Sequence, residues 1–308
     1  MPLFNINNKK LESIKKVPFS LEKDMQKLTE DNLETIFKLE FVTTEFQLNN
    51  LRIDTLAYDV ESNAFVIIEY KKVRNFSVID QGYAYLALLL NNKADFILEY
   101  NEKMDKILKK NDIDWSQSRV IFIAPSFTTH QKGAIEFQDI PMELWEISKY
   151  DNGTILYNQL KSTDTNESIN TISNTNSDIG EVSKEVKAYT EKKSLKGGSR
   201  KTRKFYFEIK KIILELNEDF EINYRKFYVS FVNKNSKESF ISLSTGKSYM
   251  DIVLNVNFEK IEDPFNIVDD VSKIGKYGVG DCRIKMRDNK DIDKIEYIIK
   301  EAYKIYSK

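Results

Sequence analysis

Residues 51–71 read LRIDTLAYDVESNAFVIIEYK, two short apolar segments joined by a turn. The segments at 51–58 and 64–71 have the length and the β-branched content of strands, and Glu61-Ser62-Asn63 supplies the turn between them. The run of consecutive apolar residues in the second segment indicates a strand that is buried on both faces. The stretch therefore predicts a β-hairpin inside a sheet.

The flanking sequence extends this hairpin into a domain. Apolar residues recur near helical spacing from Ser20 to about Leu39, and again from 77 to 90. Further segments read as strands at 45–48, 119–124 and 142–147 and as a helix at 128–137. This order of helices and strands predicts a mixed α/β domain over residues 1–158.

Three of the charged residues in this hairpin, Asp54, Glu69 and Lys71, suggest chemistry. Glu69 and Lys71 are two apart in one strand, so they point to the same side about 6.6 Å apart along it. The turn can bring Asp54 close to Glu69. Two neighbouring carboxylates repel unless a cation lies between them, and Mg²⁺ is commonly held by one or two carboxylates plus water and phosphate. The alternative is an ion-pair cluster at the end of the strands, without a metal.

The scarcity of two residue types narrows the choice of metal. Cys282 is the only cysteine and His130 the only histidine, so an intramolecular disulfide and a zinc site of several Cys or His ligands are excluded. Any metal site must use oxygen ligands, which favour Mg²⁺ or Mn²⁺. We expect His130 at the surface and Cys282 as a small core residue.

The spacing of these residues resembles the PD-(D/E)XK nuclease superfamily. The resemblance rests on Asp54, on Glu69-Tyr70-Lys71, and on Gln81 and Tyr85, which match the Gln-x-x-x-Tyr signature of the RecB-like branch. Gln81 and Tyr85 are i and i+4, so they share one helix face. Ile53 stands where many members have Pro. The layout, covering about residues 20–150, also resembles NucS-type endonuclease domains.

The resemblance implies a restriction-endonuclease-like mixed sheet flanked by helices and a site that uses Mg²⁺ or Mn²⁺. Asp54 and Glu69 would bind the metal, Lys71 would assist the attacking water or stabilise charge on the scissile phosphate, and Gln81 and Tyr85 would support the site. A first-helix acid would also contribute to the metal site; Glu34 is the expected residue, and Glu45 on the first strand is its rival.

The rest of the chain predicts a linker and a second, smaller α+β domain. Residues 161–180 contain twelve Ser, Thr or Asn among twenty, and 192–204 contain a Gly-Gly pair and seven Lys or Arg. We therefore expect a linker over 159–199 and an accessory domain over 200–308, with a closing amphipathic helix at 291–306. This half resembles a small uncharacterised domain that often follows such nucleases.

Charge is distributed unevenly between the two halves. Residues 1–150 hold 19 Lys and Arg against 23 Asp and Glu, a net charge of −4, whereas 184–308 hold 27 against 20, a net charge of +7. A basic second half suits phosphate contacts, and its aromatic residues, such as Phe205 and Phe227, could offer stacking surfaces. Ordinary core aromatics and a solvated basic linker explain the same pattern.

Together these observations predict a Mg²⁺-dependent deoxyribonuclease acting in DNA repair or defence. The rival function is a catalytically inactive nucleic-acid-binding or partner-recruiting module. DNA is the expected partner, and RNA, a second copy of the chain or a protein bound through 200–308 stay open. No segment reads as a signal peptide or membrane span, so we expect a soluble, cytoplasmic protein.

Overall fold

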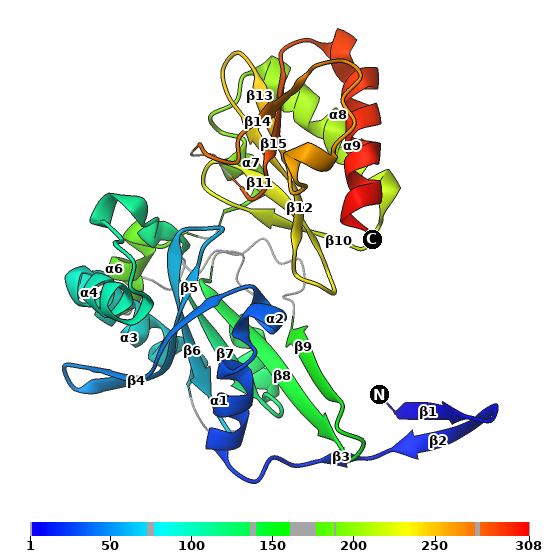
Figure 1. Cartoon of the computed structure of the whole chain (residues 1–308). Helices are drawn as coiled ribbons and strands as arrows, with labels where there is room; N and C mark the ends of the chain where they lie inside the picture. Colours follow the sequence, from blue (N-terminus) through cyan, green and yellow to red (C-terminus); the bar gives the residue numbers. More distant parts are fainter. Residues whose placement is uncertain are drawn as a thin grey trace. The chain divides into compact units, whose positions relative to one another are not determined.

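The computed structural model describes residues 2–72, 77–135, 140–160, 177–187, 189–274 and 278–307. The chain divides into two compact units, Met1–Ala188 and Tyr189–Lys308 (Figure 1). This division differs from the prediction of a linker over 159–199, because parts of that range belong to the two units. Residues 155–160 form a strand and 177–185 a helix of the first unit, whereas 161–176 lie outside the described residues.

The first unit is a mixed α/β structure, as the sequence predicts. Its strands are β1 (Leu3–Asn7), β2 (Lys10–Ile14), β3 (Lys16–Val17), β4 (Glu40–Leu48), β5 (Leu51–Asp59), β6 (Ala64–Tyr70), β7 (Arg119–Ala124), β8 (Met142–Tyr150) and β9 (Ile155–Leu160). Its helices are α1 (Glu22–Glu30), α2 (Leu33–Phe37), α3 (Val78–Asn91), α4 (Lys93–Met104), α5 (Thr129–Ala134) and α6 (Ser177–Glu185).

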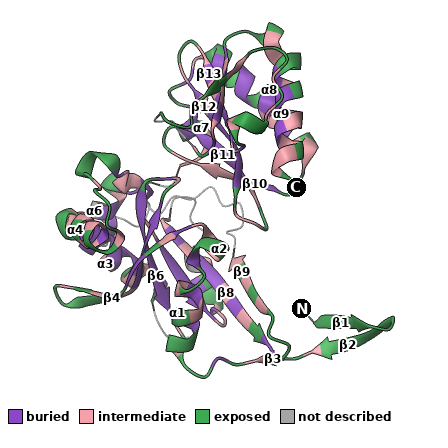
Figure 2. Ribbon diagram, in the orientation of Figure 1, coloured by how far each residue is buried: buried purple, intermediate pink, exposed green. Residues whose placement is uncertain are grey.

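A seven-stranded sheet organises this unit in the order β3-β8-β7-β6-β5-β4, with β9 also paired to β8. The predicted hairpin is present: β5 and β6 are antiparallel, and Thr55 is opposite Ile68. β6 runs parallel to β7, and β7 runs parallel to β8. Every residue of β6 is buried, as expected for a strand covered on both faces (Figure 2).

Alternation along the strands separates two hydrophobic cores. On β6, Phe65 and Ile67 pack in a core with α3, α4 and α6, whereas Val66, Ile68 and Tyr70 pack in a second core with α1 and α2. Glu69 and Lys71 continue the first series. They therefore point to the side of the sheet that α3 covers.

The predicted first helix from Ser20 to Leu39 is wrong in its extent. It is two helices, α1 and α2, separated at Asp31 and Asn32. Asp and Asn end helices readily because their side chains bond to nearby backbone, and the Asn32 amide donates to the carbonyl of Leu28 at 2.8 Å. Lys38 then leaves α2 in the left-handed region, with φ 56°. The break changes which residues of this segment reach the sheet.

α6 is a helix of the first unit. Ile179 and Val182 are buried in the same core as α3, and Lys93 forms an ion pair with Glu185. Sequence patterns did not predict α4, β9 or the N-terminal hairpin of β1 and β2.

The second unit is a six-stranded antiparallel sheet with two long helices on one side (Figure 1). The strand order is β10-β11-β12-β13-β15-β14. The strands are β10 (Phe220–Tyr224), β11 (Val229–Asn233), β12 (Ser239–Thr245), β13 (Met250–Leu254), β14 (Val268–Asp270) and β15 (Cys282–Met286). The helices are α7 (Glu191–Ser194), α8 (Arg200–Leu216) and α9 (Ile292–Tyr306).

Hydrophobic residues of α8 and α9 close the core of this unit. Ile209 and Ile298 are fully buried, and Cys282 is buried with them as the sequence predicts. Phe205 is buried in this core as well, whereas Phe227 stays 48% exposed. Among the described residues, no helix is long and apolar enough to cross a membrane.

Candidate active site

The end of the β5–β6 hairpin brings the two carboxylates of the motif together. Asp54 on β5 and Glu69 on β6 lie next to the last opposed pair of the hairpin, Thr55 and Ile68, so the two acids are side by side in the sheet. Asp54 Oδ2 accepts a hydrogen bond from the backbone N–H of Tyr70 at 3.1 Å. The hairpin register thus places both acids at one point of the sheet.

Glu69 is held firmly through one of its two oxygens. Its Oε1 accepts from Lys71 Nζ at 2.5 Å and from Gln81 Nε2 at 2.8 Å. Its Oε2 is buried without a hydrogen-bond partner, and the residue is only 2% exposed. A buried carboxylate oxygen without a partner is costly, and a cation would relieve that cost.

The electrostatic environment of Asp54 also favours a cation. Burial, followed by the charge of Glu69, raises the pKa of the Asp54 carboxyl to about 6, against the opposing effects of the Tyr70 N–H and of Lys71. Both causes penalise the charged form of Asp54. A bound cation would remove the repulsion between the two acids.

α3 supplies the supporting residues. Ser77 caps the helix by accepting a hydrogen bond from the backbone N–H of Asp80. Gln81 and Tyr85 lie about one helical turn apart, on the face of α3 that is directed toward the sheet. Gln81 Nε2 lies 3.1 Å from Tyr85 Oη, and Tyr85 Oη donates to the carbonyl of Arg52 at 3.1 Å. Burial, followed by the charge of Glu69, raises the pKa of Tyr85 above its ordinary value, so its hydroxyl stays a neutral donor.

The structure therefore brings together five of the six predicted site residues. Glu34 is the exception: it is exposed on α2, and among the described residues it forms no hydrogen bond or ion pair with the other five. The reason is the break at Asp31, which separates α2 from the helix nearest the site.

Glu22, which sequence reasoning missed, is the first-helix acid nearest the site. Its charge contributes to the raised pKa of Asp54, and its carboxylate accepts from the backbone N–H of Lys72 at 2.6 Å. The only signal in the sequence is its position two residues after Ser20, where the predicted helix begins.

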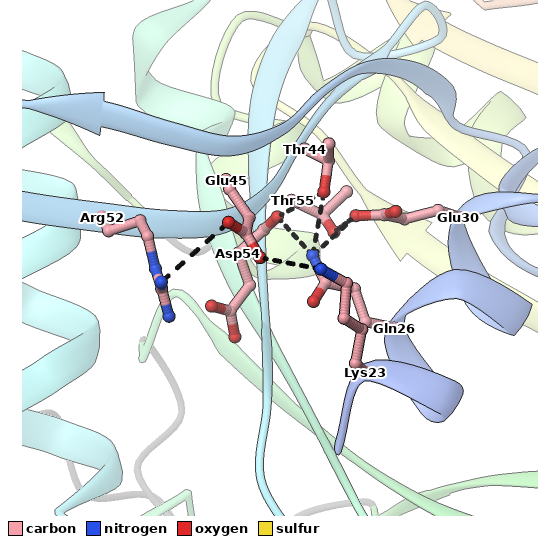
Figure 3. A network of polar contacts seen from close by, with 8 residues as sticks. All are labelled: Lys23, Gln26, Glu30, Thr44, Glu45, Arg52, Asp54 and Thr55. Carbon is pink, nitrogen blue, oxygen red and sulfur yellow. Dashed lines mark hydrogen bonds and ion pairs between the residues drawn. The ribbon is translucent and has the colours of Figure 1, made fainter. Parts of the chain in front are cut away.

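Glu45, the rival to Glu34, lies opposite Asp54 on β4, because the pairs Thr44–Thr55 and Phe46–Ile53 flank both. Its carboxylate is 3.8 Å from Lys23 and 4.0 Å from Arg52 (Figure 3). The residue is exposed. Its two cationic neighbours make it part of a surface charge cluster beside the site.

A polar network behind Asp54 fixes the strand on which it stands. Gln26 of α1 donates to the carbonyl of Asp54 at 2.9 Å, to Thr44 at 3.0 Å and to Glu30 at 3.0 Å (Figure 3). Thr55 donates to the same Glu30 oxygen. The network ties α1 to β4 and β5 at the position of the candidate site.

The residues present fit a hard divalent cation. Among the described residues, no group of three or more His, Cys, Asp or Glu side chains is arranged as a ready metal cage. Two carboxylates and open coordination positions are what Mg²⁺ commonly uses when water and substrate phosphate complete its shell. His130 is exposed on α5 and takes no part in the site.

A comparison of the whole chain with curated proteins finds one relative over nearly its full length. It is a protein of Haemophilus influenzae described only as uncharacterised, 40% identical over 304 residues, which are 99% of this chain and 100% of that one. The chain belongs to the same family as this protein. The family thus includes both units.

Two further comparisons match parts of the chain. Residues 186–305 match the family model described as a domain of unknown function, DUF5655. Among solved structures, the chain is similar to EndoMS in its apo form, at 21% identity, TM-score 0.26, 41% of this chain and 49% of that chain. It is also similar to a repair endonuclease from Pyrococcus abyssi, at 17% identity, TM-score 0.23, and 40% and 45% coverage. Each match spans less than half of the solved chain.

Proposed function

We propose that the first unit is a metal-dependent nuclease that hydrolyses DNA phosphodiester bonds on a restriction-endonuclease-like sheet. One observation carries the proposal: Glu69 and Asp54 lie together at the end of β5 and β6, and a buried oxygen of Glu69 has no partner. A module that only binds nucleic acid has no need for such a costly pair. The order Asp54, Glu69, Lys71, Gln81 and Tyr85 supports the proposal by resemblance.

Asp54 and Glu69 would hold Mg²⁺ or Mn²⁺. When bound, such an ion polarises a phosphoryl oxygen and lowers the pKa of a coordinated water. Gln81 and Lys71 orient Glu69 by bonding to its Oε1, which would leave Oε2 for the cation. Tyr85 holds Gln81 in turn.

Lys71 is the cation of the chain that would meet the scissile phosphate. It lies on the same side of β6 as Glu69, and its side chain is 20% exposed. Its backbone N–H donates to the carbonyl of Ile123 at 2.9 Å, which fixes the strand end to β7. From this position the ammonium group can stabilise negative charge that develops on the phosphate.

The deciding experiment is a cleavage assay with labelled single-stranded, double-stranded and branched DNA in Mg²⁺ or Mn²⁺. We expect metal-dependent cleavage by the full chain and a loss of at least about 100-fold in Lys71→Ala, the size seen when one charge-stabilising donor is removed. Lys103→Ala, a change at an exposed lysine of α4, serves as the matched control.

Metal uptake separates the enzyme from an inactive binding module. We expect calorimetry to show Mn²⁺ binding by the wild-type chain and none by Asp54→Ala. Equal uptake by both proteins, or folded protein that cleaves none of the three DNA forms, would favour the inactive module. Labelled single-stranded RNA in the same assay tests whether RNA is cleaved as well.

A further inference from the structure

Strand β4 contains a residue with an unusual backbone conformation beside the candidate active site. Glu45 has a φ of 50°, in the left-handed region, although it lies within an extended strand. Residues with a side chain rarely adopt this region, and glycine, asparagine and aspartate do so most readily. Such strain persists only where the surrounding structure imposes it, and it is concentrated at functional sites. The residues on either side show what this conformation does to the strand.

The two faces of β4 exchange at Glu45. Thr44 accepts a hydrogen bond from Gln26 of α1, at 3.0 Å, on one side of the sheet. Phe46 packs against Phe96 of α4, with ring centres 5.2 Å apart, on the other side. Residues two apart in a regular strand share a face. The left-handed backbone of Glu45 therefore reverses the faces of the rest of β4.

β5 exchanges its faces at the same level, at Asp54. Thr55 donates to Glu30 of α1, whereas Ile53 is fully buried in the core that contains α3 and α4. Asp54 lies opposite Glu45, so the two strands reverse together (Figure 3). Because opposed residues of two strands share a face, the reversal in β4 requires the same reversal in β5. The backbone at Asp54 therefore depends on the conformation of Glu45.

The reversal also decides which partner the Asp54 carboxylate has. Pairing of β5 with β6 has ended at this level, and the N–H of Lys71 donates to the carbonyl of Ile123 on β7. The N–H of Tyr70 points to the opposite edge of β6, toward β5. There it donates to Asp54 Oδ2 at 3.1 Å, in place of a backbone carbonyl. The edge of β6 thus holds the carboxylate that would bind the metal.

The charge of Glu45 does not account for its backbone conformation. Its carboxylate is 3.8 Å from Lys23 and 4.0 Å from Arg52, and its side chain is 41% exposed. Exposed ion pairs of this length contribute little to stability, because water and salt screen them. We therefore expect the site to depend on the backbone of Glu45 rather than on its charge.

We infer that Glu45 is a positioning residue for Asp54. Its left-handed backbone reverses β4 and β5 and thereby sets the direction of the Asp54 carboxylate, which the metal would use. The inference deepens the proposed function and rests on it for the role of Asp54 as a ligand. Glu45 acts through Asp54 and needs no contact of its own with metal or substrate. Residues that tolerate the left-handed region should replace Glu45, whereas β-branched residues should not.

Mn²⁺ binding by full-length variants, measured by calorimetry, tests the inference. Glu45→Val should lower the affinity at least about tenfold, the loss expected when the orientation of a ligand is disturbed. Glu45→Asn and Glu45→Gly, which favour the left-handed region, should bind like the wild type. Glu45→Gln removes only the charge and should bind like the wild type as well. Gln47→Val places the same β-branched residue at an exposed position of β4 with an ordinary backbone and serves as the matched control.

Hydrogen exchange in EDTA gives a second readout, which needs no metal. The Tyr70 amide is bonded to the Asp54 carboxylate. The next amide, that of Lys71, is bonded to β7 and serves as the internal reference. In Glu45→Val the Tyr70 amide should exchange at least about tenfold faster relative to the reference, whereas Glu45→Asn should change neither amide. A general loss of stability would accelerate both amides together.

The outcomes separate the inference from the proposed function. If circular dichroism shows that Glu45→Val does not fold, Glu45→Thr, which is β-branched but polar, takes its place. An unchanged Tyr70 amide in the folded variant, or equal losses of Mn²⁺ affinity in Glu45→Asn and Glu45→Val, would overturn the inference. A wild type that binds no Mn²⁺ and cleaves no DNA would count against the proposed function alone, because exchange at Tyr70 still measures the positioning of Asp54.

Discussion

Gln81 Nε2 lies 2.8 Å from Glu69 Oε1, the same oxygen that accepts from Lys71. One oxygen of the buried acid is thus doubly bonded, whereas the other has no partner. An orienting bond of this kind restricts the carboxylate to one rotamer. The position of the proposed metal ligand therefore depends on a helix, α3, that follows the hairpin in the chain.

The Gln81–Glu69 bond predicts that Gln81→Ala will weaken both metal binding and cleavage. Loss of a residue that orients a ligand typically costs 10–100-fold, and we expect that range for the affinity for Mn²⁺ by calorimetry and for the cleavage rate. Gln81→Glu puts a third acid beside Glu69, so this variant should be as impaired as Gln81→Ala. Val78→Ala on the same helix shortens a buried side chain but keeps the Gln81–Glu69 bond, so it serves as the control. An equal loss of metal affinity and cleavage in Val78→Ala would contradict an orienting role for Gln81.

The raised pKa of Asp54 predicts how the metal-free protein responds to pH. The folded pKa is about 6, above the ordinary value of 3.8, so the favourable contribution to stability is complete below pH 3.8 and is lost as the pH rises through 6. Asp54→Asn should therefore stabilise the metal-free protein at pH 7, by about 1–3 kcal/mol. Thermal melts of both proteins in EDTA, at pH 5 and pH 7, measure the difference.

The affinity for metal should increase with pH, whereas the stability of the metal-free protein should decrease. Because Mn²⁺ takes the deprotonated carboxylate, its affinity should fall about tenfold for each pH unit below 6. Calorimetry across this range, with Asp95→Asn at an exposed position of α4 as the control, checks the slope. An affinity that does not change between pH 5 and pH 7 would contradict a ligand role for Asp54.

The network behind Asp54 predicts a cost in stability for a residue far from any substrate. Gln26→Ala removes the donor to the Asp54 carbonyl, Thr44 and Glu30, and Gln26 is 8% exposed. Leaving these partly buried acceptors without this donor should cost about 1–3 kcal/mol. Lys27→Ala, on the solvent side of the same helix, should change stability by less than about 0.5 kcal/mol. Denaturation in urea compares the two.

Local geometry explains how much of the site the sequence could predict. Glu69 and Lys71 share a face because strand residues alternate, and Gln81 and Tyr85 share a face because they are one helical turn apart. The hairpin turn then fixes Asp54 beside Glu69. Each of these relations extends over about thirty residues or fewer and depends on spacing alone.

Contacts that depend on how distant segments dock were not predictable in this way. Glu22 and Gln26 reach the site because α1 packs across β5 and β6, and no periodicity in residues 20–39 records that contact. The sequence places Glu34 at the site only if residues 20–39 form one continuous helix, and the break at Asp31 and Asn32 prevents this. α6 joins the first core through Val182, although a polar segment separates it from the rest of the unit.

Gly278 and Gly133 are predicted to respond differently to the same substitution, and thermal unfolding measures the difference. Gly278→Ala should destabilise the second unit by more than about 1 kcal/mol, because its φ of +87° disfavours a side chain and a Cβ would overlap Ser242. Gly133→Ala on α5 meets no atom within 4 Å and should be neutral or stabilise by about 0.5–1 kcal/mol.

Calorimetry can resolve the unfolding of the two units, so each change should alter a different transition. Gly278→Ala should lower only the transition of the second unit. A transition that does not move would mean that the chain at Gly278 lies far enough from Ser242 to accept a side chain.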